Sequence, residues 1–276
     1  MNILYVCHRF PYPPKRGGKI RPFNMIRHLT ASGHQVTVCS LARSEQEAQE
    51  AQGIAPHCEA FEIGQVQEWA QMARMVVRLP LITPSSMGYF YSPELKRRID
   101  KLLASKTWDL IFVHCSSVAQ YVAHVRGIPK ILDFGDMDSQ KWLEYANYKP
   151  FPLSMGCRLE GTKMLGAEKR LARQCDLSTA TTRAEWETLN GYKAGANTDA
   201  FLNCVDADFF CPLDDSYGAD TISFIGRMYY HTNQECKSRF CAQVRPLLRA
   251  SRPAMKLLIV GAAPSPAMHR LGELPM

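Results

Sequence analysis

The sequence predicts an α/β protein with a complete Rossmann-like, parallel-sheet domain at its N-terminus and an incomplete second Rossmann-like domain after it. Short apolar runs alternate with segments of helical length almost from the start. Apolar strands joined by helices are typical of a parallel sheet covered on both faces. The pattern also pauses at a turn-rich stretch near residues 205–220 and then restarts, which predicts a domain boundary.

The first domain, residues 1–205, is predicted from strand-like runs at 3–7, 35–41, 109–115, 130–134 and 177–181. A Pro/Gly-rich loop ending in Gly17-Gly18 follows the first run, and the spacing then predicts a helix from about Arg21 to Ala31. Gly33 is expected to end that helix, because glycine tolerates left-handed backbone geometry.

The second domain, residues 206–276, restarts with a predicted strand at 221–226, a helix at about 233–250 and a strand at 256–260. This is the opening βαβ unit of another Rossmann-like domain. The segment is too short for the four or more strands of a doubly wound sheet, so we expect an uncovered sheet edge and association through it.

The net charge of +7 lies entirely at the start of the chain. Residues 1–44 contain seven Lys and Arg residues and no Asp or Glu, whereas the remainder holds 26 residues of each sign. This distribution disfavours a uniformly basic nucleic-acid coat and favours a local anion site near the N-terminus.

Several classes of protein are disfavoured by what the sequence contains. No apolar run approaches the 18 residues of a membrane span, and the first apolar run is too short for a signal peptide. Ten cysteines without a Cys-x-x-Cys pair indicate free thiols in a reducing cytosol, and no zinc site. We therefore expect a cytoplasmic protein.

The loop around Gly17 and Gly18 is the best candidate for the anion site. Paired glycines between a strand and a helix let backbone amides approach a phosphate, and a helix N-terminus favours negative charge. Countercharge would come from Lys15, Arg16, Lys19 and Arg21. The alternative is a solvated turn with basic side chains.

Two further residues are predicted at strand ends that face a cleft. Arg227 follows Gly226 after the first strand of the second domain and suits bidentate phosphate binding. His114, at the end of the run 109–115, could anchor a sugar or act as a general acid or base. The alternatives are a surface arginine and a structural histidine.

Other patterns carry less weight. Asp133-Phe134-Gly135 spells a kinase motif without its companions, and Asp136-Met137-Asp138 spells a metal-binding triplet that helix capping explains equally well. We therefore predict no metal. No Gly-x-Gly-x-x-Gly occurs, so the dinucleotide-binding fingerprint is absent and no nicotinamide cofactor is predicted either.

The segment 65–79 places four apolar residues on one helical face: Trp69, Met72, Val76 and Leu79. We expect this face to pack on the core, with contact to an anionic membrane surface as the alternative.

Taken together, the motifs resemble family 4 glycosyltransferases of the two-Rossmann-domain (GT-B) type, and more closely the bacterial sugar transferases associated with exopolysaccharide and PEP-CTERM systems. The resemblance rests on four segments along the whole chain: Tyr5 to Gly18, Leu132 to Trp142, Asn203 to Pro212, and Phe224 to Met228.

The resemblance implies metal-independent transfer, with retention, of a sugar from a nucleotide-diphosphate donor to a glycan or lipid-linked acceptor. It implies that Gly17, Gly18 and Arg227 bind the donor diphosphate and that His114 lies near the reacting sugar. No cofactor is implied besides the donor substrate. Lipid-linked acceptors would bring the protein to the inner face of the cytoplasmic membrane.

The sequence also departs from this family. Asn203-Cys204 replaces the usual Asn-Gly, and the lysine common after the arginine is absent. The sequence ends before the region that carries the family's Glu-x7-Glu motif. We therefore expect a truncated transferase with little activity alone, or a non-catalytic module of that fold that binds anions or glycans.

Overall fold

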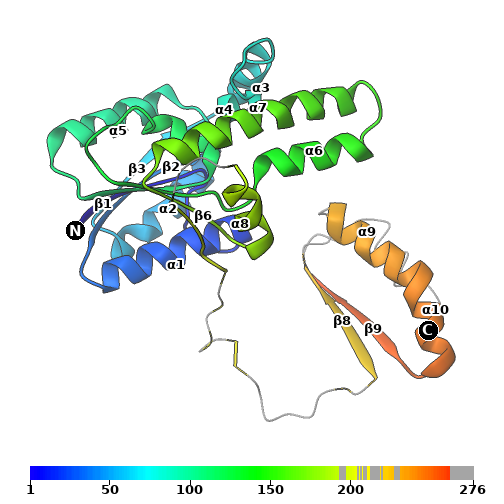
Figure 1. Cartoon of the computed structure of the whole chain (residues 1–276). Helices are drawn as coiled ribbons and strands as arrows, with labels where there is room; N and C mark the ends of the chain where they lie inside the picture. The colour runs from blue at the N-terminus through cyan, green and yellow to red at the C-terminus, as the bar shows by residue number, and fades with distance from the viewer. Residues whose placement is uncertain are drawn as a thin grey trace. The chain divides into compact units, whose positions relative to one another are not determined.

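The computed structural model divides the chain into two compact units, Met1–Val205 and Asp206–Met276 (Figure 1). The structure describes residues 1–192, 197–203, 205, 207, 210, 211, 218, 220–226 and 231–261.

The first unit is built on a seven-stranded parallel sheet in the order β3-β2-β1-β4-β5-β6-β7. Its strands are β1 (Asn2–Cys7), β2 (Gln35–Ala42), β3 (Ala60–Gln65), β4 (Leu110–His114), β5 (Lys130–Asp133), β6 (Leu177–Ala180) and β7 (Asn197–Ala200). The α/β class and the five predicted strands are confirmed. The two strands that were missed, β3 and β7, lie at the edges of the sheet, where a strand does not need an apolar sequence.

Helices cover both faces of this sheet. They are α1 (Gly17–Ala31), α2 (Glu45–Ala51), α3 (Glu68–Val77), α4 (Ser85–Tyr89), α5 (Pro93–Ser105), α6 (Asp138–Tyr148), α7 (Leu153–Gln174) and α8 (Arg183–Asn190), with short 3₁₀ helices η1 (Gln52–His57) and η2 (Ser116–Tyr121). Figure 1 shows α1 on one face and α5 on the other.

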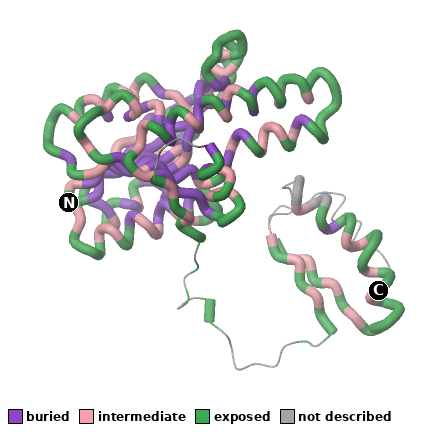
Figure 2. The backbone as a smooth tube through the Cα atoms, in the orientation of Figure 1, coloured by how far each residue is buried: buried purple, intermediate pink, exposed green. Residues whose placement is uncertain are grey.

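Alternate residues of β1 face two separate hydrophobic clusters. Leu4 and Val6 pack in the cluster that includes residues of α5 and α7, whereas Ile3, Tyr5 and Cys7 pack in the cluster that includes Ile26 of α1. Figure 2 shows the buried residues concentrated in the strands between these layers. This burial on both faces explains why the strands are apolar without alternation.

Helix α1 begins four residues earlier than predicted. Gly17 and Gly18 form its first turn rather than the preceding loop, with Arg16 in extended geometry at the N-cap. The sequence pattern placed the start of the helix too far along the chain, because glycine and the internal Pro22 both have poor helix propensity. Gly33 follows the helix with a φ of +82°, as predicted.

The expectation that the apolar face of α3 packs on the core is wrong. Trp69 and Val76 are 72% and 55% exposed, and Met72 and Leu79 are also exposed. Helix α3 is held instead through its opposite side, where buried Gln71 donates from Nε2 to the carbonyl of Tyr89 at 2.7 Å.

The second unit contains a parallel strand pair with a helix between its strands, which is the predicted βαβ unit. Its elements are β8 (Thr221–Ile225), α9 (His231–Arg239), a π-helical turn (Phe240–Val244), α10 (Arg245–Ser251) and β9 (Lys256–Val260). Phe224 and Phe240 pack edge to face at 5.1 Å between ring centroids, which joins the first strand to the helical segment.

Across the described part of the chain, no helix combines the length and apolarity that a membrane span requires. The nine cysteines within the described residues are free thiols.

Candidate functional site

The centre of the site is a histidine–aspartate pair at the carboxyl ends of two neighbouring strands. His114 ends β4 and Asp133 ends β5, and the two residues are opposite each other in the sheet register. Nδ1 of His114 lies 2.8 Å from Oδ2 of Asp133. Both side chains are buried, with 4% and 0% exposure. The register of the sheet therefore brings the pair together.

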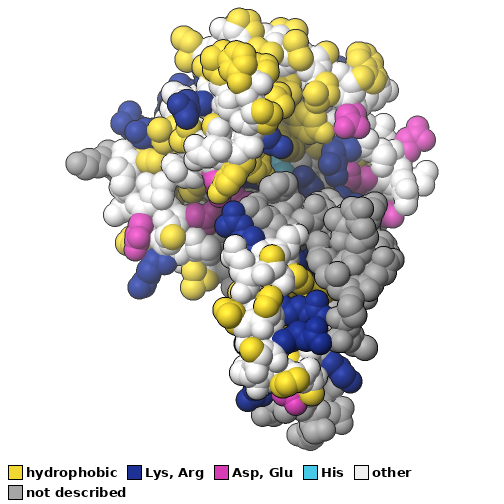
Figure 3. Space-filling model, turned by 90° about the vertical axis from the view of Figure 1, so that its right-hand side faces the viewer, with side chains coloured by type: hydrophobic (Ala, Val, Ile, Leu, Met, Phe, Trp, Pro, Cys, Tyr) yellow, Lys and Arg dark blue, Asp and Glu magenta, His cyan; other side chains and the backbone are white. Residues whose placement is uncertain are grey.

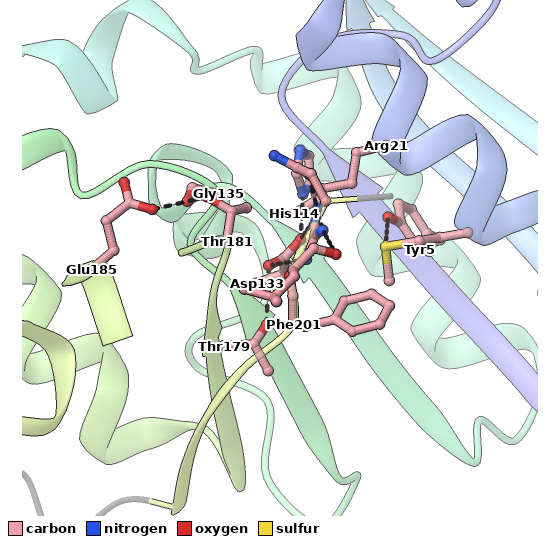
Figure 4. Close-up of polar contacts among 12 residues, drawn as sticks. Tyr5, Arg21, His114, Asp133, Gly135, Thr179, Thr181, Glu185 and Phe201 are labelled. Carbon is pink, nitrogen blue, oxygen red and sulfur yellow. Dashed lines mark hydrogen bonds and ion pairs between the residues drawn. The ribbon is translucent and has the colours of Figure 1, made fainter. Parts of the chain in front are cut away.

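Every acceptor position of the Asp133 carboxylate is occupied (Figure 4). Arg21 donates to Oδ2 through Nε at 2.8 Å and to Oδ1 through Nη2 at 3.1 Å. Thr179 Oγ1 also donates to Oδ1, at 3.0 Å. Burial alone would raise the pKa of Asp133, but the hydrogen bonds from His114 and Arg21 outweigh it and lower the pKa to about 2.

The ionised carboxylate determines the tautomer of His114. A carboxylate can only accept, so Nδ1 of His114 must carry the proton that joins it to Asp133. In the neutral imidazole, Nε2 is then the acceptor. Nε2 has no hydrogen-bond partner among the residues that the structure describes. The site can therefore offer Nε2 to a ligand hydroxyl.

Arg21 is committed to the protein itself, which corrects its prediction as a free countercharge for a ligand. Besides Asp133, its guanidinium donates to the carbonyls of Phe201 and Leu202 at 2.6 and 3.2 Å. It also donates to Oδ1 of Asn203 at 3.1 Å and lies 4.6 Å from the centroid of the Phe201 ring. These contacts use all five N–H groups of the side chain.

Lys19 needs the same correction. Its Nζ lies 2.7 Å from Oε1 of Glu47 in α2, and both side chains are largely buried. Burial would raise the pKa of Glu47, but Lys19 and Arg43 together lower it. Lys19 therefore ties α1 to α2 and does not face a ligand.

The first turn of α1 is open, in contrast to these two ion pairs. Gly17, Gly18, Lys15 and Arg16 are all exposed, and the turn has neither an acidic residue nor a side-chain cap. Among the described residues, the amides of Gly17 and Gly18 find no acceptor. A helix N-terminus with unsatisfied amides and adjacent cations is suited to bind an anion.

The space around these glycines is also open. A Cβ added at Gly17 would meet no atom within 4 Å, and one at Gly18 would make only ordinary contacts with His8 and Arg9. The fold itself does not require glycine at either position. The glycines leave room for a ligand beside the backbone.

His8 lies between the open turn and the buried pair. Its ring is 5.7 Å from that of His114, and a Cβ at Gly18 would lie 3.8 Å from its Nε2. Burial, reinforced by the neighbouring His114, lowers the pKa of His8, and its buried Nδ1 has no partner among the described residues. His8 is therefore a neutral imidazole with an unused polar atom at the site.

Asp138 has a local structural role, at the first position of α6. Its Oδ2 accepts from Ser116 Oγ at 3.3 Å beside Cys115, whose φ is +85°. Burial raises the pKa of Asp138. No group of three or more metal-ligating side chains occurs in the part of the chain that the structure describes.

Arg227 lies outside the described residues, so its predicted contact with the diphosphate stays a prediction. Glu160 and Glu168 have the Glu-x7-Glu spacing by coincidence. Both lie in α7 and are buried, where Glu160 accepts from the amides of Ser85 and Ser86 and Glu168 accepts from Ser139.

Sequence reasoning singled out His114 but missed Asp133, His8 and Thr179. Asp133 was discounted because its tripeptide spells an unrelated motif. The signal that could have found it is positional, since Asp133 ends the strand that follows the one ending in His114. In a parallel sheet, polar residues at the carboxyl ends of successive strands meet at one edge.

A parallel sheet with polar groups and an open helix N-terminus at its carboxyl edge defines a ligand-binding α/β protein of the Rossmann-like kind. Residues 16–209 match the family described as Glycosyltransferase Family 4, and the chain belongs to that family.

Comparison with solved structures agrees on the fold. Sucrose-phosphate synthase from Thermosynechococcus elongatus aligns with a TM-score of 0.58 at 13% identity, covering 96% of this chain and 71% of that one. A Phytolacca americana protein, UGT2, aligns with a TM-score of 0.52 at 8% identity, covering 96% and 72%. Its structure is a complex with UDP-2fluoro-glucose and pterostilbene. A search of curated protein sequences finds no match.

Proposed function

We propose that the chain binds a nucleotide-diphosphate sugar and transfers its sugar to a glycan or lipid-linked acceptor, with retention and without a metal. The observation that carries the proposal is the pairing of two features at one sheet edge. An unsatisfied, cationic helix N-terminus lies at the end of β1, and a histidine with an available Nε2 lies at the end of the adjacent β4.

The donor diphosphate is assigned to the first turn of α1. Amides of Gly17 and Gly18 would donate to phosphate oxygens, with Lys15 and Arg16 beside them. During transfer, the bond between the anomeric carbon and the diphosphate oxygen breaks, and negative charge develops on the leaving group. Fixed amides and cations stabilise that charge without reorganisation. Arg227 of the second unit is proposed as a further diphosphate ligand.

His114 is assigned to the reacting sugar. Its Nε2 accepts a hydrogen bond from a sugar hydroxyl, while Asp133 fixes the ring and its tautomer. His8, which is neutral and next to both groups, completes the wall between the diphosphate and the sugar.

The biological setting is proposed from the family resemblance. We propose that the reaction takes place in the cytoplasm and serves exopolysaccharide biosynthesis, with the nucleotide sugar as substrate and no cofactor. A second candidate function is a non-catalytic module that binds nucleotide diphosphates, because the open turn is able to bind an anion without any contribution from His114.

Titration calorimetry with a panel of UDP-, GDP- and ADP-sugars tests the donor site, and release of nucleotide diphosphate with added acceptors tests transfer. We expect donor binding that is weakened by Gly18→Ala and turnover that is abolished by His114→Ala. Asp136→Asn, at an exposed carboxylate, serves as the control. Binding without turnover under all conditions would favour the non-catalytic module. Absence of binding to every nucleotide sugar in the panel would contradict both the transferase and the non-catalytic module.

A further inference from the structure

We propose that one face of the first unit docks on an anionic lipid bilayer. This bilayer face is formed by α3, by the loop that follows it and by the turn between α6 and α7. Its most exposed apolar side chains are Trp69, Val77, Ile82, Tyr148, Phe151 and Met155.

The exposure of these side chains is the first observation. Ile82 is 89% exposed, Phe151 78% and Trp69 72%. Figure 3 shows hydrophobic side chains gathered over the upper part of the view, with Lys and Arg beside them. Large apolar residues scattered singly need no explanation, but a contiguous exposed group marks an interaction surface.

The two segments that form the face are fixed to each other. Nζ of Lys163 in α7 donates to the carbonyl of Leu79 at 2.6 Å. Glu160 of α7 accepts from the amides of Ser85 and Ser86 in α4, at 3.0 and 2.8 Å. The loop after α3 therefore lies against α7 at Glu160 and Lys163, within about two helical turns of Met155.

The charged residues of the bilayer face indicate what binds to it. Segments 69–93 and 145–159 contain no Asp or Glu, and their cations are Arg74, Arg78, Lys149 and Arg158. The two carboxylates of α7, Glu160 and Glu168, are only 7% and 0% exposed. One exposed carboxylate, Glu68 in the first turn of α3, opposes the exposed Lys149 and Arg158 and the half-buried Arg74 and Arg78. The face is therefore net positive, and its apolar groups lie among these charges.

An anionic bilayer matches this combination. Anionic lipid headgroups attract Lys and Arg side chains that lie near the surface, and the attraction weakens as salt is raised. Trp and other apolar side chains enter the boundary between headgroups and acyl chains. The inference uses residues outside the proposed donor and sugar sites, so it does not depend on the chemistry at His114.

Flotation of the full chain with lipid vesicles tests the proposal. We expect binding to phosphatidylcholine vesicles that contain phosphatidylglycerol, weakening as salt is raised, and little binding to phosphatidylcholine alone. The double variant Ile82→Asp/Phe151→Asp should lose binding by at least about tenfold, because it replaces inserted apolar groups with anions. Leu247→Asp, at a residue 73% exposed in the second unit, should leave binding unchanged.

A variant that removes two cations separates the attraction to anionic headgroups from the insertion of apolar side chains. Lys149→Gln/Arg158→Gln should weaken binding to the anionic vesicles roughly tenfold, whereas Lys101→Gln/Arg126→Gln, at exposed cations elsewhere, should not. All these positions are exposed, so thermal unfolding should match the wild type.

Failure of the wild-type chain to bind the anionic vesicles would overturn the proposal. Binding that survives Ile82→Asp/Phe151→Asp would do the same. Concentration-dependent self-association that this variant abolishes, without vesicle binding, would assign the face to a second copy of the chain instead.

Discussion

The buried centre at Asp133 and the open turn at Gly17-Gly18 lie at the same edge of one sheet. They differ in whether the protein itself satisfies their hydrogen-bonding groups. At Asp133, every acceptor position is occupied by His114, Arg21 or Thr179. At the turn, the amides of Gly17 and Gly18 find no acceptor among the described residues, and Lys15 and Arg16 are exposed. The saturated centre stabilises the fold and positions His114, whereas the open turn keeps amides and cations that a ligand can bind.

This contrast indicates which basic residues are available to bind a ligand. Four cations near the start of α1 have similar sequence surroundings, but Lys19 and Arg21 neutralise buried carboxylates while Lys15 and Arg16 are exposed. Substitutions in the centre should therefore affect stability and activity together. Substitutions in the turn should affect binding alone.

The largest effect is expected for Asp133→Asn. The variant leaves Arg21, whose side chain is 10% exposed, as an uncompensated buried charge, which should lower the free energy of unfolding by about 3–5 kcal/mol. It also permits the wrong tautomer of His114, so transfer should fall roughly a thousandfold or more. Urea unfolding and nucleotide release measure the two effects. The exposed Asp136→Asn should change stability by less than about 0.5 kcal/mol, and equal effects of the two variants would contradict the account.

Acid should weaken the centre within a defined window. The pKa of Asp133 is lowered to about 2 in the folded chain, so its stabilising contribution is fully present above the unfolded value of about 4. As pH falls from about 4 towards 2, roughly 2 kcal/mol should be lost. Urea unfolding at stepped pH should show this loss in the wild type and a shallower dependence in Asp133→Asn. The same pH dependence of the free energy of unfolding in both proteins would show that Arg21 and His114 do not keep Asp133 ionised.

A smaller and more selective effect is expected for Gly17→Ala and Gly18→Ala. Neither added methyl group clashes with the protein, so stability should stay within about 0.5 kcal/mol of the wild type. Donor binding should weaken about tenfold, because the methyl group occupies the space assigned to the phosphate, which corresponds to about 1.4 kcal/mol. Gly166→Ala is a matched control, since that glycine is exposed in α7 and also has open space around it. Unaltered calorimetric titrations for Gly18→Ala would remove the turn from the donor site.

The smallest effect belongs to Lys15→Gln/Arg16→Gln. Both side chains are exposed and contribute through screened attraction, so donor binding should fall only a few-fold at low salt and less at high salt. The melting temperature should not change. A drop in melting temperature as large as that of Asp133→Asn would show that these cations are structural, like Lys19 and Arg21.

The sequence was sufficient for the α/β class and the five apolar strands of the first unit, because burial on both faces of a parallel sheet leaves a clear apolar pattern. It was also sufficient for the βαβ unit, although β8 and β9 are not buried on both faces. It was insufficient for β7, a polar edge strand, and for the outward direction of Trp69, since a helical apolar face does not reveal what covers it. His114 could be predicted from its place at a strand end. The pairing of Arg21 with Asp133 could not, because the two are 112 residues apart and meet only through the fold.

The central claim is that Asp133 holds His114 with its proton on Nδ1 and leaves Nε2 to accept from a substrate. Nitrogen-15 NMR of the imidazole rings, with His114 assigned by its loss in His114→Ala, tests this directly at neutral pH. The account predicts a protonated Nδ1 and an unprotonated Nε2 in the wild type, and loss of that preference in Asp133→Asn. A proton on Nε2 of His114 in the wild type would contradict it.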